Sequence, residues 1–484
     1  MGFKPVPLNA PAGTSGAKRG LLSVVTLGLQ GGTRFASNWL IASFAGKVVF
    51  GTVAVATSLA FLLHTFWPSS TQSAASKFVA RARGKEDDVE VHAVARQLSL
   101  RVVQVTAFLA VVSVIAWVVL FQGQWWEGLC VAAILVTVCT SQYARGIHFG
   151  ADQVARGTRV DIIASVVGIA ATGVLLALGV RNMLLTLPLS LSLGVYSLLC
   201  WPWTAHGRPE RALRSEIDKF VTFSAIGSVA SAGMLQMSQL VTKQFGEATS
   251  GIYGVALQLV TPMSLITTAL IMVFYPGLAK AHGAGDHETL RRHTDMATRG
   301  FVAVLVAFFG GVAIAARPVI HVVYSAVSGR HDYAPAAILI PVFCLALLVN
   351  NVATPSVSAI TAGEHKYMWY PMLASQGGLL CAVIVWFTVV PHIGVFAVAA
   401  GYAFGAIVCA CFLYAVAWRL TGQKWVDVSV QMVVACVLIA VASWAVQRFS
   451  PNLWIDIAVA VVFGLGWLAW STPVMLRLIR QNRS

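Results

Sequence analysis

Long apolar runs follow one another along almost the whole chain of 484 residues. A helix needs about 20 mostly apolar residues to cross the hydrocarbon core of a bilayer. Such runs form helices, because lipid cannot satisfy the backbone N–H and C=O groups. We therefore expect an all-α polytopic membrane protein with about 14 transmembrane helices. Its predicted spans lie at about 21–43, 48–67, 102–121, 126–144, 160–180, 183–203, 220–242, 251–276, 300–324, 336–360, 368–390, 393–418, 428–446 and 453–475.

The composition excludes a soluble protein and offers no enzyme chemistry. Charged residues make up only 11% of the chain, whereas soluble domains carry about 25%. The eight cysteines all lie in apolar runs without a CxxC pair or a nearby histidine, so we expect neither a metal site nor a cofactor. The motifs HExxH, GxSxG and GxxxxGK[ST] are absent. The chain is therefore not expected to be an enzyme or to hydrolyse ATP.

Basic residues concentrate on one side of the predicted helices. If the N-terminus lies in the cytoplasm, 26 of the 33 Lys and Arg residues fall on the cytoplasmic side, 6 fall outside and Arg34 lies within a helix. Such asymmetry orients membrane proteins, and an even number of spans then places both termini in the cytoplasm. The net charge of +15 is explained by topology, so we do not expect nucleic acid as a partner.

The chain also repeats itself at a spacing near 200 residues. The stretch 78–87 after the second span aligns with 277–286 after the eighth, at a shift of 199. Six spans separate the copies, so both have the same orientation, and facing repeats are typical of transporters. Chance similarity between Ala-rich stretches is the alternative. The expected parts are a flexible cytoplasmic tail at 1–20, an N-lobe at 21–217, a C-lobe at 218–420 and a C-terminal helix pair at 421–484.

Arg34 interrupts the first apolar run near its middle. A central membrane arginine costs at least about 2.5–3.5 kcal/mol, so it should face protein or a wet cavity. Gln30 and Asn38 share its helix face, and all 18 acidic residues fall in loops or near the ends of spans. Arg34 could bind neighbouring carbonyl or hydroxyl groups. We favour an anionic, phosphate-bearing substrate, because a guanidinium matches phosphate oxygens.

Other polar groups within the predicted helices are less specific. Polar cavities suit sugars, but small polar side chains also join membrane helices, and both roles stay open. The residues that we expect to bind substrate are Arg34, Gln30, Asn38, Gln236, Gln239, Gln258, Asn350 and Asn351.

Three stretches carry a resemblance to a known superfamily. They are Gln239–Gly246 followed by Gly251–Gly254, then Tyr275–Lys280, and then Ala362–Lys366. Their order and the fourteen spans resemble the multidrug/oligosaccharidyl-lipid/polysaccharide exporter superfamily over almost the whole chain. Within it, the chain looks most like the Wzx-type polysaccharide flippases. This implies that an undecaprenyl-pyrophosphate-linked glycan moves from the cytoplasmic to the outer leaflet of the bacterial inner membrane, by alternating access. Membrane lipids, a polysaccharide polymerase and a co-polymerase would be its partners.

Three alternatives remain. Lipid II flippases share the fold and the anionic cargo, but that family carries several cationic residues in its cavity, whereas Arg34 stands alone at mid-depth here. A drug or ion antiporter of the same superfamily would typically use membrane carboxylates, and none is expected at that depth. A non-transport membrane scaffold of a polysaccharide assembly complex is the alternative from another class. The internal repeat argues against that last reading.

The parallel repeat makes a prediction about topology. Reporters fused within 78–92 and within 280–295 should both read cytoplasmic, because an even number of spans separates these loops. Paired fusions to green fluorescent protein and alkaline phosphatase measure this, with a fusion at 181–182 as the external control. Opposite readings from the two loops would overturn the parallel repeat.

Overall fold

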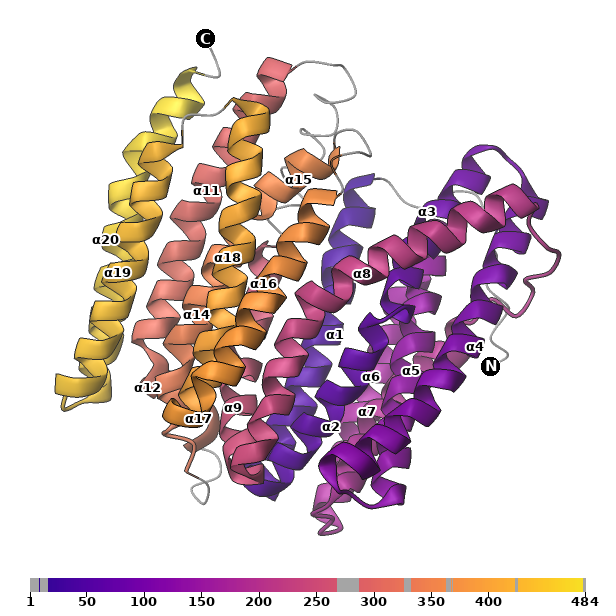
Figure 1. Cartoon of the computed structure of the whole chain (residues 1–484), viewed down its shortest axis with the longest axis horizontal. Helices are drawn as coiled ribbons and strands as arrows, with labels where there is room; N and C mark the ends of the chain where they lie inside the picture. The colour runs from indigo at the N-terminus through magenta and orange to yellow at the C-terminus, as the bar shows by residue number, and fades with distance from the viewer. Residues whose placement is uncertain are drawn as a thin grey trace. The chain divides into compact units, whose positions relative to one another are not determined.

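All regular structure in the described residues is helical (Figure 1). The computed structural model describes residues 8, 16–267, 287–325, 332–362, 367, 369–422 and 425–481. Within them, thirteen helices are long and apolar enough to cross a membrane. The first predicted span corresponds to α1 (Gly16–Ala45), a further helix of 30 residues, whose Gln30, Arg34 and Asn38 lower its mean hydropathy. The predicted fold class, an all-α polytopic membrane protein, is therefore confirmed.

The chain divides into two compact units, Met1–Gly251 and Ile252–Ser484. The helices that follow α1 as far as the boundary are α2 (Lys47–Thr65), α3 (Pro68–Gly84), α4 (Asp88–Phe121), α5 (Trp125–Gly150), α6 (Val154–Ala177), η1 (Met183–Thr186), α7 (Leu187–Cys200), α8 (Arg211–Val241) and η2 (Thr242–Phe245). The boundary itself falls within α9 (Glu247–Val260). After the boundary come η3 (Thr261–Met263), α11 (His287–Ile314), α12 (Ala316–Ile320), η4 (His321–Ser325), α14 (Ala336–Val352), α15 (Thr354–Ala362), α16 (Trp369–Thr388), α17 (Val390–Ile393), α18 (Val395–Thr421), α19 (Val426–Phe449) and α20 (Leu453–Gln481).

Parts of the sequence-based expectations lie outside the described residues. These are the repeat copy at 277–286, the family-like stretches 275–280 and 363–366, the end of the span predicted at 251–276 and most of the tail at 1–15. The boundaries expected for the two six-helix lobes stay predictions.

The first unit contains helical structure that the apolar runs do not predict. The stretch 68–84 forms α3, and both α4 and α8 begin about ten residues or more before their apolar runs. Apolar residues of α3 recur every three or four positions, so one face can be buried. Ala75, Phe78 and Val79 are fully buried on that face. A Cβ at Gly146 of α5 would clash with the backbone of Gln72, so only glycine permits this close approach.

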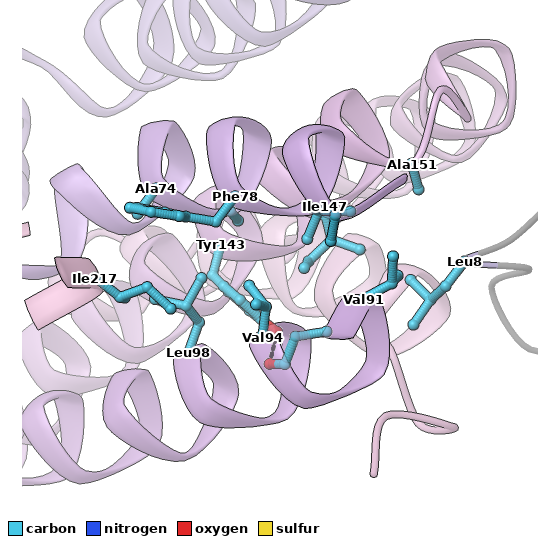
Figure 2. Close-up of a cluster of buried hydrophobic side chains, with 14 of the residues drawn as sticks. Leu8, Ala74, Phe78, Val91, Val94, Leu98, Tyr143, Ile147, Ala151 and Ile217 are labelled. Atoms are coloured by element: carbon cyan, nitrogen blue, oxygen red, sulfur yellow. Dashed lines mark hydrogen bonds between the residues drawn. The ribbon is translucent and has the colours of Figure 1, made fainter. Parts of the chain in front are cut away.

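A buried hydrophobic cluster joins α3 to α4, α5 and the start of α8 (Figure 2). Tyr143 lies inside it and donates a hydrogen bond to the carbonyl of Ala95 at 2.6 Å. Leu8, from the predicted tail, is also buried there. Two ion pairs, Arg81–Glu216 and Arg101–Asp218, link the same helices at the surface. Arg81 and Arg101 lie within helical segments that the apolar runs do not predict, because tertiary packing buries the apolar faces of these segments.

Hydrogen bonds fix α1 against α6. The hydroxyl groups of Thr26 and Thr158 lie 2.7 Å apart, and Thr33 donates to Ser165 at 2.6 Å. Both pairs have a sequence separation of 132, and seven residues separate them on each helix, which is about two turns. The two helices therefore run parallel and in register, which sets the relative level of their side chains.

In the second unit, two charged clusters attach the C-terminal helices α19 and α20. Arg317 binds Asp456 through two hydrogen bonds, at 2.7 and 2.8 Å, and also donates to the carbonyls of Val446 and Ser450. At the other end of α19, Arg299 binds Asp427. Both helices pack on α11 (Figure 1). Arg317 thus belongs to a short helix, α12, and its charge anchors α20.

The Arg317 cluster predicts a large effect of a single substitution. Asp456 is fully buried, so Asp456→Ala leaves a partly buried arginine without its counter-charge, at a cost of about 3 kcal/mol. Thermal unfolding of the purified protein in detergent should show a clearly lowered Tm. Arg448→Ala, which removes an exposed charge on α19, is the control. An unchanged Tm for Asp456→Ala would contradict the structural role of the pair.

Candidate functional site

A polar cavity of about 180 Å³ lies within the helices of the first unit. Five helices line it, namely α1, α2, α5, α6 and α7. Its lining side chains combine two arginines and one carboxylate with several hydroxyl and amide groups, so the cavity differs from the apolar packing around it. The lining residues are Gln30, Gly31, Thr33, Arg34, Phe61, Val138, Ser141, Gln142, Arg145, Asp161, Ala164, Ser165, Leu189, Ser192 and Leu193.

Arg34 reaches this cavity from the middle of α1. Its guanidinium carbon lies 4.2 Å from the centroid of the Phe61 ring on α2, a cation–π contact that holds the side chain in place. Among the ion pairs of the described residues, none involves Arg34. A membrane-embedded cation that faces a polar cavity without a carboxylate partner keeps its charge available to an anion.

The same cavity contains an ion pair that sequence reasoning missed. Arg145 of α5 donates from Nη2 to Oδ1 of Asp161 on α6 at 2.7 Å, and their side chains are only 3% and 4% exposed. The guanidinium of Arg145 also lies 4.4 Å from the centroid of the Tyr196 ring. Both charged residues therefore lie within helices and inside the helix bundle, although Asp161 stands at the start of the span predicted at 160–180 and Arg145 directly follows the one predicted at 126–144.

The physical reason is that α5 and α6 extend beyond their apolar runs. A buried charge next to an opposite charge costs far less than an isolated one, so each residue allows the other inside the helix bundle. A usable signal was present in the sequence. Ser141 and Arg145 are four residues apart, as are Asp161 and Ser165, and each polar stripe of this kind faces one side of a helix.

The residues expected to bind substrate lie in different places. Gln30 and Arg34 line the cavity, whereas Asn38 is half-buried on α1 and is not part of the lining. Gln236 is half-buried on α8. Gln239 is buried and donates to the carbonyl of Ser250 at 2.9 Å, which closes the turn between α8 and α9.

The other three expected residues belong to the second unit. Gln258 is buried on α9. Asn351 is buried on α14 and donates to the carbonyl of Leu347 at 2.7 Å, one turn earlier in the same helix. Asn350 is exposed in its unit. None of the three lines the cavity that contains Arg34.

Solved structures of membrane transporters share this fold. An inward-facing multidrug resistance MATE family transporter of the MOP superfamily aligns with a TM-score of 0.63 at 15% identity, covering 88% of this chain and 99% of that one. A MATE protein in a straight conformation aligns with a TM-score of 0.58 at 15% identity, over 86% and 97%. A MOP superfamily transporter from Pyrococcus furiosus, described as having a binding pocket of reverse polarity, aligns with a TM-score of 0.58 at 14% identity, over 91% and 98%. At these identities the likeness shows the fold alone.

A family model identifies the chain more closely. The model described as lipid II flippase MurJ matches residues 100–463, which is most of the chain. No curated protein matches the sequence. The predicted superfamily of exporters is confirmed, and its families are transporters and flippases rather than enzymes.

Within the superfamily, the match favours the lipid II flippases, which stood second to the Wzx-type flippases on sequence grounds. That ranking depended on Arg34 being the lone cation at mid-depth, and the cavity holds Arg145 as well. The chain is a multi-pass membrane protein of the exporter superfamily, and it belongs to the MurJ lipid II flippase family.

Proposed function

We propose that the chain flips lipid II, the lipid-linked peptidoglycan precursor, from the cytoplasmic to the outer leaflet of the bacterial cytoplasmic membrane. The observation that carries the proposal is the cationic cavity of the first unit, in which Arg34 and Arg145 stand among hydroxyl and amide groups. The family match supports the cargo, but it begins at residue 100. The role of Arg34 therefore rests on the geometry of the cavity.

The chemistry of the cavity suits the pyrophosphate of a polyprenyl-linked glycan. A charged headgroup cannot cross hydrocarbon alone, because transfer of an ion out of water is very costly. Guanidinium groups replace part of its hydration with charge-assisted hydrogen bonds. Gln142 and Ser192 line the same cavity and can donate to phosphate or sugar oxygens. The polyprenyl tail stays in the bilayer during this movement.

The size of the cavity indicates which part of the cargo it holds. Its volume of about 180 Å³ is below the roughly 300–1,000 Å³ of pockets that enclose a drug-sized ligand. It therefore suits the phosphate end of the headgroup, and the larger glycan needs additional space. We propose alternating access as the way in which this space opens first to one side of the membrane and then to the other.

The charge of the cavity argues against drug export. Two arginines face one carboxylate, so the lining carries a net positive charge that repels the cationic drugs of multidrug exporters. Likeness to MATE structures shows the fold and leaves the cargo open. The pyrophosphate of another undecaprenyl-linked glycan could bind the same two arginines, Arg34 and Arg145. The flipping assay therefore also measures transport of such a glycan.

We propose a location and topology from the placement of charge and from the internal repeat. Both termini lie in the cytoplasm, and two six-helix lobes precede a C-terminal helix pair. No ATP-binding motif accompanies them, so flipping draws on an ion gradient, on the membrane potential or on consumption of lipid II outside.

Arg34→Ala tests the proposal. Loss of a charge-assisted contact to phosphate costs about 1.5–3 kcal/mol, which corresponds to roughly a tenfold to hundredfold loss of flipping rate. The measurement is flipping of fluorescent lipid II in vesicles reconstituted with the purified full-length protein. Arg34→Lys keeps the charge without the planar fork and should retain intermediate activity.

Arg448→Ala removes an exposed cation of α19 and serves as the matched control, with wild-type flipping expected. A well-inserted Arg34→Ala protein that flips lipid II at the wild-type rate would contradict the anion site. A parallel assay with an undecaprenyl-pyrophosphate-linked oligosaccharide lacking the peptide should show slower flipping than lipid II. Exclusive transport of that oligosaccharide would overturn lipid II as the cargo.

A further inference from the structure

Two arginine–aspartate pairs of the described residues, each with a buried aspartate, differ in how many of their hydrogen-bonding groups have a partner. Arg317 contacts both carboxylate oxygens of Asp456 and two backbone carbonyls. Arg145 contacts one oxygen of Asp161 through one nitrogen. Within the described part of the chain, Nε of Arg145 and Oδ2 of Asp161 are buried and have no hydrogen-bond partner. The first pair has the geometry of a structural clamp, whereas the second keeps unused hydrogen-bonding capacity.

The two residues that keep this unused capacity line the polar cavity. Arg145 and Asp161 both line the space that Arg34 also lines. A buried polar atom without a partner costs about 1–3 kcal/mol, so a structural pair would be expected to satisfy these atoms. A ligand that enters the cavity can supply the missing partner to Arg145. The pair is therefore placed where substrate binding can change it.

The register of α1 and α6 places the two arginines at neighbouring levels. The offset of 132 between hydrogen-bonded residues sets Asp161 level with Leu29. Arg34 lies five residues further along α1, or about 7.5 Å along the axis. Arg145 contacts Asp161 directly, so its guanidinium lies near the level of Leu29 and Asp161, not at the level of Arg34. Two cations at successive levels suit a diphosphate, which presents two phosphate groups in a row.

The charges in the cavity add a second argument. With the Arg145–Asp161 pair closed, Arg34 is the one lining cation without a carboxylate partner. A diphosphate ester carries about two negative charges, so its neutralisation needs a second cation. That cation is present but is occupied by a carboxylate of the protein itself. Opening the pair gives the ligand access to a second guanidinium, that of Arg145.

We propose that Asp161 is an internal anion that occupies Arg145 in the empty cavity and competes with the substrate diphosphate for it. Binding exchanges the carboxylate for a phosphate oxygen on Arg145, and release allows the ion pair to close again. This inference rests on the proposed function and extends it to the regulation of affinity. The competition weakens binding, because the carboxylate loses its partner when the ligand enters. A carrier needs such weakening, since cargo that binds too tightly is not released.

Asp161→Asn tests the competition directly. The substitution keeps the size of the side chain but removes its charge, so Arg145 becomes available to the ligand. Inorganic pyrophosphate should bind the purified full-length protein about tenfold more tightly by isothermal titration calorimetry. Flipping of lipid II in reconstituted vesicles should become slower at saturating substrate, because release is slowed. If Asp161 had only a structural role, Asp161→Asn would weaken pyrophosphate binding. It would not combine tighter binding with slower flipping.

A double-mutant cycle distinguishes two ways in which Asp161→Asn could raise pyrophosphate affinity. One is the release of Arg145 to the ligand, and the other is the loss of a negative charge near the ligand. In the Arg145→Ala background, Asp161→Asn should no longer increase pyrophosphate affinity, because the group that it releases is absent. An equal increase in both backgrounds would overturn the exchange, and so would unchanged or weaker binding by Asp161→Asn alone. Asp456→Asn is the matched control, because it neutralises a buried aspartate of the other ion pair and should leave pyrophosphate affinity unchanged.

The outcomes also separate this inference from the proposed function. If Arg34→Ala lowers pyrophosphate affinity while Asp161→Asn does not raise it, the anion site stands and the competition fails. If Arg34→Ala leaves both pyrophosphate binding and lipid II flipping unchanged, the proposed function fails.

Discussion

Charge inside a membrane helix has to be matched by an opposite charge, a polar group or water, since hydrocarbon solvates none of it. In this protein the constraint is met in two ways. Arg317 and Asp456 satisfy each other almost completely and attach the C-terminal helix α20. Arg34, Arg145 and Asp161 instead share the wall of one cavity, where the charges are only partly matched. The first arrangement holds the fold together, and the second is available for function.

The cavity depends on packing that begins far from it. Parallel α1 and α6, joined by Thr26–Thr158 and Thr33–Ser165, bring Arg34 and Asp161 to the same space. The buried cluster around Tyr143 holds α3, α4 and α5 together, and Arg145 follows Tyr143 by two residues on α5. A change in that cluster would therefore also shift one of the two cations, even though the cluster itself contacts no ligand.

Much of this fold could be predicted from the sequence, because lipid imposes one simple rule on spanning segments. Apolar runs of sufficient length located α1 and the thirteen candidate spans of the described residues, and Arg34 stood out as a charge in the middle of α1. Helix α3 was missed because its buried face consists largely of small residues and its length is set by packing against α5, not by the thickness of the bilayer. Arg145 and Asp161 were missed for a related reason. Each lies at the end of an apolar run, and their ion pair depends on which helices become neighbours. Ranking the Wzx-type flippases first followed from that omission.

The most direct test of the account is to identify the lipid-linked glycan that accumulates on the cytoplasmic side of the membrane when cells are depleted of this protein. Mass spectrometry of extracted polyprenyl-linked lipids, combined with protection from an added external enzyme, measures both identity and side. Lipid II should accumulate in the cytoplasmic leaflet, with its glycan and peptide intact. Accumulation of a different undecaprenyl-linked glycan, with the level and sidedness of lipid II unchanged, would contradict it.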